Sequence, residues 1–174
     1  MKQLSTAFLI LIAISGFSQD SVAHQLKGLI IRSHYVSDNV KLVGIKGDSA
    51  GTGLVYKENS SGVWIPMNEG KSLAPLVKDV QAVAAFNDSI FLAGTWKNGF
   101  YRSVDSGKSW ARLEFPSQDI RSIAIAHRTP GTAYAATTSH GIQKTTDFGL
   151  SWKEISPKDK RMNFACWSLS LEQK

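Results

Sequence analysis

Two stretches of this chain decide its fold: YRSVDSGKSW at residues 101–110 and QKTTDFGLSW at residues 143–152. When they are aligned on their aspartates, each has Ser or Thr two residues before the acid, Gly two residues after it and Trp five residues after it. The matching residues are Ser103, Asp105, Gly107 and Trp110 in one copy, and Thr145, Asp147, Gly149 and Trp152 in the other. A separation of 42 residues between the two tryptophans is too long for one hairpin, so we interpret the motif as part of a larger repeating unit.

A third, weaker copy precedes these two. The stretch GLVYKENSSGVW begins at Gly53 and places Asn59 and Trp64 in the positions of the acid and the tryptophan. Trp64 and Trp110 are 46 residues apart. Self-similarity at a period of about 40 to 50 residues is typical of arrays of supersecondary units, including propeller blades.

Short stretches in which apolar residues alternate with polar or small ones lie between the motifs, and they predict four strands in each unit. IRSIAIA, TAYAATT, GIQKTT and SWKEIS follow one another in the last unit and are separated by turn residues. The sequence therefore predicts an all-β chain, a β-propeller of four-stranded antiparallel blades. The expected blades cover approximately residues 26–67, 79–115 and 119–156, and the first strand of a further blade is expected at residues 163–171.

Three blades alone would leave apolar sheet faces and strand edges uncovered. We therefore expect either a partial propeller that lacks further blades or closure by self-association.

The repeated motif resembles the Asp-box, or bacterial neuraminidase repeat, whose pattern is Ser-x-Asp-x-Gly-x-Thr/Ser-Trp. The resemblance implies a turn between the third and fourth strands of each blade. In such a turn the Asp accepts hydrogen bonds from backbone amides two or three residues ahead, Gly adopts positive φ and Trp anchors the outer strand. We interpret the box residues, including Asn59 and Trp64 of the weak copy, as structural and not as catalytic.

The family that the motif resembles includes sialidases, sortilin-type receptors, other glycoside hydrolases and photosystem assembly factors. Sialidases carry an Arg-Ile-Pro signature on an early strand, but this chain has Arg32-Ser33-His34 there and no Arg-Ile-Pro anywhere. The remaining acids have no recurring spacing that would place two carboxyls across a glycosidic bond. We therefore assign no catalytic residue, metal ligand or cofactor from the sequence. The alternative is a fragment of a sialidase-like or other glycoside hydrolase, with some catalytic residues outside this chain.

We expect an exported, non-enzymatic repeat protein that binds a protein or glycan, or serves as an assembly factor, through a loop face. Propeller topology indicates the face opposite the boxes. Trp96, Lys97, Asn98 and His140 are the candidate ligand-binding residues there, because exposed aromatic side chains beside polar ones suit protein or glycan recognition. The insertion at residues 48–52, the connection at 68–79 and the lysine-rich stretch at 157–161 are expected on the same face. The alternative for Trp96 is that its ring covers a neighbouring blade.

The first 18 residues carry Lys2, the apolar stretch FLILIAI and small residues before Gln19, a pattern typical of a signal peptide. We therefore expect a secreted or periplasmic protein whose mature chain has no membrane span. Its 19 Lys and Arg against 14 Asp and Glu give a net charge of +5, which is scattered and argues against a nucleic-acid partner. A single cysteine excludes an internal disulfide, so packing must stabilise the fold.

Overall fold

A computed structural model describes residues 26, 28–47, 54–68, 73 and 77–156. Within these residues the chain is all-β, with no helix and therefore none that could cross a membrane. The strands form three separate four-stranded sheets. The first sheet contains β1 (Ile30–Val36), β2 (Lys41–Lys46), β3 (Val55–Glu58) and β4 (Trp64–Pro66). The second sheet contains β5 (Val80–Ala85), β6 (Phe91–Thr95), β7 (Phe100–Ser103) and β8 (Ala111–Arg112). The third sheet contains β9 (Ile120–Ile125), β10 (Ala133–Thr137), β11 (Ile142–Thr145) and β12 (Lys153–Glu154).

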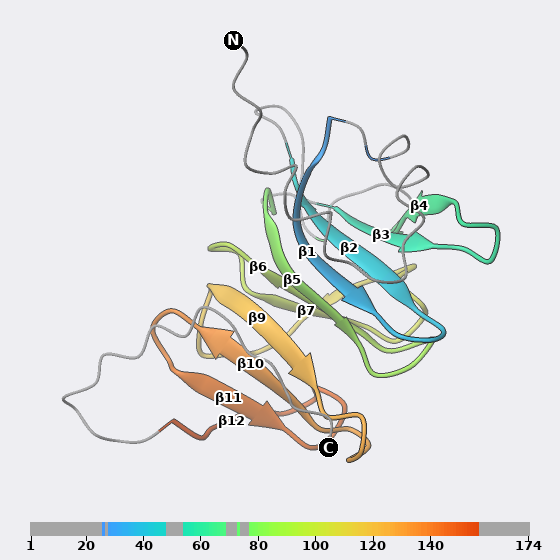
Figure 1. Cartoon of the computed structure of the whole chain (residues 1–174). Coiled ribbons are helices and arrows are strands. Elements are labelled where there is room, and N and C mark those ends of the chain that lie inside the picture. Colours follow the sequence, from blue (N-terminus) through green and yellow to red (C-terminus); the bar gives the residue numbers. More distant parts are fainter. Residues whose placement is uncertain (1–25, 27, 48–53, 69–72, 74–76, 157–174) are drawn as a thin grey trace, which may run out of the picture.

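Each sheet is antiparallel and keeps its strands in chain order, which is the topology of a propeller blade. The first strands β1, β5 and β9 lie side by side, and the later strands of each sheet extend away from them (Figure 1). The predicted signal peptide at 1–18, the insertion at 48–52, the lysine-rich stretch at 157–161 and the predicted strand at 163–171 lie outside the described residues.

The turns divide the molecule into two faces. The first-to-second-strand turns and the third-to-fourth-strand turns share what we call the box face. For example, the amide of Ser106 in a box donates to the carbonyl of Ser89 in the β5–β6 turn at 3.0 Å. The second-to-third-strand turns and the connections between blades lie at the other ends of the strands, which we call the opposite face.

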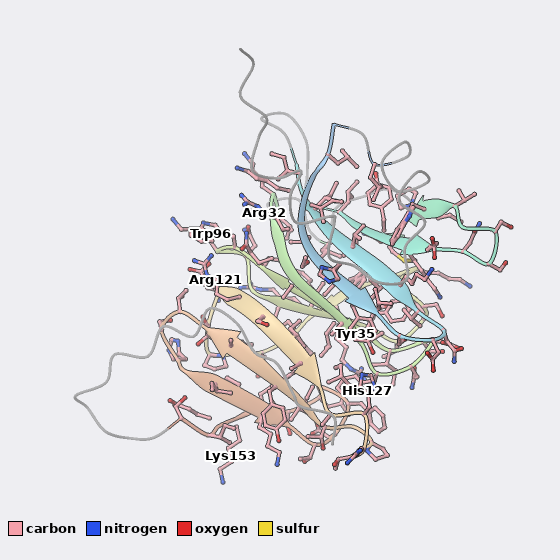
Figure 2. All side chains as sticks on the ribbon, in the orientation of Figure 1. Arg32, Tyr35, Trp96, Arg121, His127 and Lys153 are labelled. Atoms are coloured by element: carbon pink, nitrogen blue, oxygen red, sulfur yellow. The ribbon has the colours of Figure 1, made fainter. Side chains whose placement is uncertain are left out.

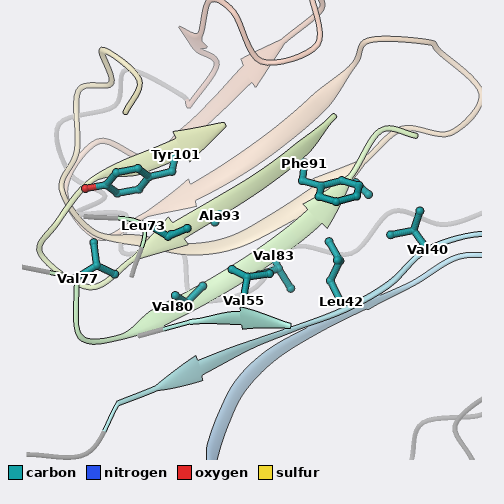
Figure 3. Close-up of a cluster of buried hydrophobic side chains, with 11 residues drawn as sticks. Val40, Leu42, Val55, Leu73, Val77, Val80, Val83, Phe91, Ala93 and Tyr101 are labelled. Carbon is teal, nitrogen blue, oxygen red and sulfur yellow. The ribbon is translucent and has the colours of Figure 1, made fainter. Parts of the chain in front are cut away.

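Two apolar layers hold the three blades together. One layer fills the space between the first and second blades and includes Leu42, Val80 and Phe91 (Figure 3). The other lies between the second and third blades and includes Phe100 and Ile120. All five side chains are fully buried.

Glycine sets the distance between neighbouring blades. A Cβ on Gly44 would lie 2.8 Å from Val80 Cγ1, and a Cβ on Gly94 would lie 2.6 Å from Ile120 Cβ. Atoms cannot approach this closely without displacement of the neighbour. Each glycine therefore allows the first strand of the next blade to pack directly on the second strand.

The first strand of every blade contains a register shift at its second or third residue. The paired residues skip Arg32 in β1, Gln81 in β5 and Arg121 in β9. Such bulges redirect a side chain out of the regular alternation of a strand. The three bulges occur at the opposite face, near the start of each inner strand.

Candidate functional site

The first box is closed by its own side chains. Asp105 Oδ1 accepts from the Ser103 hydroxyl at 2.8 Å and from the Ser109 amide at 2.9 Å, and Asp105 Oδ2 accepts from the Ser109 hydroxyl at 2.5 Å. The Ser103 oxygen in turn accepts from the buried amide of Gly107 at 2.8 Å. Hydrogen bonds from the hydroxyl and then the amide of Ser109 lower the pKa of Asp105 to about 2.

The second box repeats this network. Asp147 accepts from the Leu150 amide at 3.0 Å, from the Ser151 amide at 2.9 Å and from the Thr145 hydroxyl at 2.7 Å. Thr145 Oγ1 accepts from the buried amide of Gly149 at 3.0 Å. Slight burial raises the pKa of Asp147, but hydrogen bonds led by the Ser151 hydroxyl outweigh it and hold the pKa at about 2.

The structure corrects one detail of the sequence interpretation. The sequence interpretation placed the backbone donors two or three residues ahead of the acid. The Leu150 amide is three residues ahead of Asp147, as expected, but the Ser109 and Ser151 amides are four residues ahead of their aspartates. The loop reaches this far because two consecutive residues in each box have positive φ, Ser106 and Gly107 in one and Phe148 and Gly149 in the other.

The boxes also join neighbouring blades. The Phe148 carbonyl accepts from Arg102 Nε of the preceding blade at 2.7 Å, and the Gly107 carbonyl accepts from the Asn68 amide at 2.8 Å. The Trp152 ring packs against Phe100 and Phe115 of the preceding blade, with centroid distances of 5.2 and 5.5 Å. We conclude that the box carboxylates are occupied by turn contacts and are poor candidates for catalysis.

The weak copy in the first blade forms a different turn. Asn59 Oδ1 accepts from the amides of Ser61 and Val63, both at 2.9 Å. Glu58 pairs with Trp64, which starts β4, so this hairpin is offset by one residue from the β7–β8 hairpin, where Arg102 pairs with Ala111. Trp64 is buried, as the sequence interpretation expected of an anchor.

Trp96 is the centre of the candidate site on the opposite face. Its side chain follows β6 and is 37% exposed. The Arg121 guanidinium lies 3.8 Å from the ring centroid, and Lys97 Nζ lies 5.7 Å from it. Two cations over one ring are a cation–π arrangement. Trp96 therefore both contacts the neighbouring blade through Arg121 and keeps part of its surface exposed (Figure 2).

Asp119 ties the two adjacent loops together. Its Oδ1 accepts from the Lys97 amide at 2.7 Å, and its Oδ2 accepts from the Thr138 hydroxyl at 3.5 Å. Lys97 has a φ of 62°, an uncommon conformation for a lysine, and the hydrogen bond to Asp119 helps to hold it. The hydrogen bonds of Asp119 therefore hold the backbone next to Trp96 through contacts with two blades.

Asp79 links the same region to the first blade. It is only 9% exposed, and its Oδ1 lies 3.3 Å from Arg32 Nε, an ion pair without hydrogen-bond alignment. Its backbone carbonyl accepts from the Trp96 amide at 3.0 Å.

Burial lowers the pKa of Arg121, while the charges of Asp119 and Asp79 raise it. An arginine pKa is ordinarily above 12, so Arg121 stays charged near neutral pH.

The other two sequence candidates have local roles. The Asn98 carbonyl accepts from the Tyr101 hydroxyl at 3.1 Å. His140 is exposed, its Nδ1 lies 2.8 Å from the Ser139 hydroxyl oxygen, and its amide donates to Thr137 Oγ1. The structure thus joins Trp96 and Lys97 in one cluster, whereas among the described residues no hydrogen bond or ring contact links His140 to that cluster.

Sequence reasoning missed the two arginines that complete the cluster. Arg32 and Arg121 come from inner strands and not from loops, so a search of loops could not find them. The available signal was the tripeptide Ile-Arg-Ser, which occurs at residues 31–33 and again at 120–122. Both copies place the arginine at the bulge.

Charge distinguishes the two faces. In the described turns of the box face there are four acids, Asp38, Asp88, Asp105 and Asp147, and two bases, Lys108 and Arg128, a net charge of 2 − 4 = −2. The described loops, connections and bulges of the opposite face have four bases and three acids, a net charge of 4 − 3 = +1. These seven residues are Arg32, Lys78, Lys97 and Arg121, with Asp79, Glu114 and Asp119.

The box face carries a groove of its own, between the first and second blades. Asp38, Asp88 and Ser106 are among the residues that line it, and a Lys41–Glu58 ion pair of 2.5 Å lies at its wall. The side chains of Asp38 and Asp88 have no recorded hydrogen-bond or ion-pair partner among the described residues. This groove is a second candidate site, and its two acids are less engaged in hydrogen bonds than the box aspartates.

No protein-family model matches this chain, and no curated protein matches it. Solved structures, in contrast, match this chain. The GH74 xyloglucanase from Xanthomonas campestris is similar with a TM-score of 0.58 and 15% identity, over 79% of this chain and 25% of the xyloglucanase. A GH74 enzyme from Niastella koreensis is similar with a TM-score of 0.52 and 16% identity, over 73% of this chain and 22% of that enzyme. YCF48 bound to D1 peptide is similar with a TM-score of 0.50 and 17% identity, over 71% of this chain and 39% of YCF48.

These neighbours are β-propeller proteins. This chain folds as part of a β-propeller. It spans between about a fifth and two fifths of the length of the proteins to which it is similar. At this level of identity the likeness establishes the fold alone.

Proposed function

We propose that this chain is a non-enzymatic binding module, exported from the cytoplasm, whose opposite face holds an acidic peptide segment of a protein partner. The observation that carries the proposal is the partly exposed Trp96 ring with the Arg121 and Lys97 cations beside it. An aromatic surface beside fixed cations can contact an apolar side chain and a carboxylate of one extended peptide.

Two further observations support a negatively charged ligand. The opposite face has a net charge of +1 in its described loops, connections and bulges, and the described turns of the box face have −2. The amide of Lys97 already holds one oxygen of Asp119, and Arg32 pairs with Asp79, so the two acids whose charges act on Arg121 are engaged. The likeness in fold to YCF48, which is solved with a bound peptide, is compatible with a peptide ligand.

The proposal is tested with a fluorescently labelled peptide of alternating Glu and Leu residues that has a free carboxyl terminus. Anisotropy should rise with protein concentration for this peptide and not for an amidated Lys–Leu counterpart. Trp96→Ala and Arg121→Gln should each weaken binding at least about tenfold, which corresponds to about 1.4 kcal/mol.

Lys153→Gln is the matched control, because it removes one positive charge from the exposed outer strand β12, away from Trp96 (Figure 2). Equal weakening by Lys153→Gln and Arg121→Gln would indicate nonspecific charge attraction. Unchanged binding in both Trp96→Ala and Arg121→Gln would place the ligand elsewhere.

The second candidate is a segment of a glycoside hydrolase, and the box-face groove is the observation that favours it. Among the described residues, its carboxylates Asp38 and Asp88 have no hydrogen-bond or ion-pair partner, unlike Asp105 and Asp147. Glycosidases need two such carboxyls facing one another. The fold likeness to GH74 enzymes is compatible with this candidate.

Hydrolysis of xyloglucan oligosaccharides and aryl glycosides distinguishes the two candidates. We expect no turnover above a buffer blank. Turnover that disappears in Asp38→Asn or Asp88→Asn, with the melting temperature unchanged, would establish the hydrolase candidate in place of the binding module.

A further inference from the structure

A pocket of about 270 Å³ lies on the box face, where the inner strands of the three blades end. Each blade contributes one aromatic side chain to its lining: Tyr35 belongs to β1, Phe86 directly follows β5, and His127 lies two residues after β9. Tyr35 and His127 lie at the end of the strands away from Trp96 (Figure 2). We call this site the inner pocket.

The apolar layers between the blades hold the aromatic walls of the inner pocket in place. Tyr35 packs against both layers, and Phe86 packs against the layer between the second and third blades. The Phe86 ring also contacts the Phe148 ring edge to face, with a centroid distance of 5.4 Å. The Tyr35 and His127 rings lie 6.3 Å apart and are inclined by 32° to each other. The aromatic walls are therefore formed before a ligand binds.

Hydrogen bonds within two turns fix the rim of the inner pocket. In the β1–β2 turn, Ser37 Oγ accepts from the Val40 amide at 3.2 Å. In the β5–β6 turn, Asn87 Oδ1 accepts from two backbone amides of the same turn, both at 2.9 Å. Asp38 lies in the first of these turns and Asp88 in the second, and both line the pocket. The backbone that carries the two acids is therefore held in position.

The charge at this rim is negative. Asp38 and Asp88 are exposed, and within the described part of the chain neither carboxylate has a hydrogen-bond or ion-pair partner. The described lining of the inner pocket contains no Lys or Arg. The same two acids also line the neighbouring groove, where Lys41 pairs with Glu58 instead. Two carboxylates without a counter-charge of their own therefore line one small aromatic pocket.

Aromatic rings and carboxylates together favour a particular kind of ligand. Ring faces attract cations, and aromatic pockets are the usual recognition sites for quaternary ammonium groups. Carboxylates at the rim add attraction for a cation and disfavour an anion. Trp96 shows the opposite arrangement, because its ring has the cations Arg121 and Lys97 beside it. The two aromatic sites of this chain therefore differ in the charge that they favour.

We propose that the inner pocket binds an organic ammonium cation, with the alkylated nitrogen against the Tyr35 and Phe86 rings and with Asp38 and Asp88 supplying the opposite charge. A volume of about 270 Å³ suits a group of small-molecule size. The site lies at the other end of the strands from Trp96, so this inference does not rest on the acidic-peptide proposal.

Choline and the neutral alcohol in which a carbon atom replaces its nitrogen test the proposal on the wild-type chain, because they share one shape and differ in charge. An NMR titration of the isotopically labelled full chain with choline should give saturable shifts of the amides at residues 37–39, 86–88 and 127. The dissociation constant should be at least about tenfold larger for the neutral alcohol. Equal affinities, no saturable shift with choline, or shifts confined to the surroundings of Trp96 would each overturn the proposal.

A short capped peptide that contains trimethyllysine distinguishes two sources of the ammonium group. Tighter binding of this peptide than of choline would support the proposal and identify a lysine side chain of a partner as the source. Equal binding of the two would support it with a free small molecule as the source. Weaker binding of both than of the neutral alcohol would contradict it.

Substitutions at the rim test the role of charge. Asp38→Asn and Asp88→Asn keep the size of the side chain, and each should weaken choline binding at least about threefold. Glu154→Gln is the matched control, because it removes one negative charge from the exposed outer strand β12 and should leave the affinity unchanged. Phe86→Leu keeps an apolar side chain, removes a ring and should also weaken binding. Equal weakening by Glu154→Gln and Asp38→Asn, or unchanged binding in both rim variants, would overturn the proposal.

Discussion

At the scale of residues, two side chains of each box accept hydrogen bonds from different backbone amides of the turn. Ser103 and Thr145 accept from the buried amides of Gly107 and Gly149, whereas Asp105 accepts from an exposed amide. An unsatisfied buried donor costs more than an exposed one, because water cannot replace the lost acceptor. The hydroxyl before the acid should therefore matter more to stability than the acid itself.

Thr145→Val tests this division. It keeps the shape of the side chain and removes the acceptor for the Gly149 amide, so the free energy of unfolding should fall by about 1–3 kcal/mol. Thr146→Val is the matched control, since Thr146 is exposed and its hydroxyl makes no hydrogen bond within the part of the chain that the structure describes. Equal losses in the two variants, measured by urea unfolding, would show that the Thr145 hydrogen bonds do not stabilise the turn.

The box aspartates predict an acid-sensitive stability. Both have a pKa of about 2 in the folded chain, below the 3.8 of the free side chain. A lowered folded pKa stabilises the protein above the unfolded pKa, and this contribution is lost as pH falls from about 4 to 2. The double variant Asp105→Asn and Asp147→Asn should show a smaller fall in unfolding free energy over that range. A fall as steep as in the wild type would mean that other carboxyls cause it.

At the scale of elements, the sequence predicted the blades well because their signals are short-range. Strand alternation and the box spacing lie within about a dozen residues, and the predicted fold class of four-stranded antiparallel sheets is confirmed. The β3–β4 register was not predictable, since the weak copy lacks both the Asp and the Gly two residues after it. The Arg32, Asp79 and Arg121 contacts were missed because they depend on bulges and on packing between different blades.

Gly94→Ala tests the packing between blades. Its new Cβ would approach Ile120 Cβ to 2.6 Å, so the second and third blades must separate. Such overpacking costs about 1–3 kcal/mol, and Gly94→Val should cost more. Urea unfolding of both variants measures this, and an unchanged midpoint in either would show that the interface is looser than described.

At the scale of the whole molecule, the inner strands bring the candidate binding residues to the opposite face. The bulges of β1 and β9 bring Arg32 and Arg121 to the opposite face, and Asp119 fixes the loops around Trp96. The box turns at the other end hold the blades together. Stability and peptide binding are thus assigned to opposite ends of the same strands.

Salt dependence follows from the charge on this face. Affinity for the Glu–Leu peptide should decrease as NaCl is raised from about 0.05 to 0.5 M, because exposed charge pairs are screened over about 10 Å at 0.1 M. Fluorescence anisotropy measures the decrease. The Arg121→Gln variant should show a shallower salt dependence than the wild type, and an identical slope would remove Arg121 from the interface.

The most direct test of the binding face is the mapping of backbone amide shifts by NMR while the Glu–Leu peptide is added. The proposal predicts that the perturbed amides cluster at Arg32, Asp79, Trp96, Lys97 and at residues 119–121. Perturbations confined to the box-face groove around Asp38 and Asp88, or none at all, would contradict the assignment of binding to the opposite face.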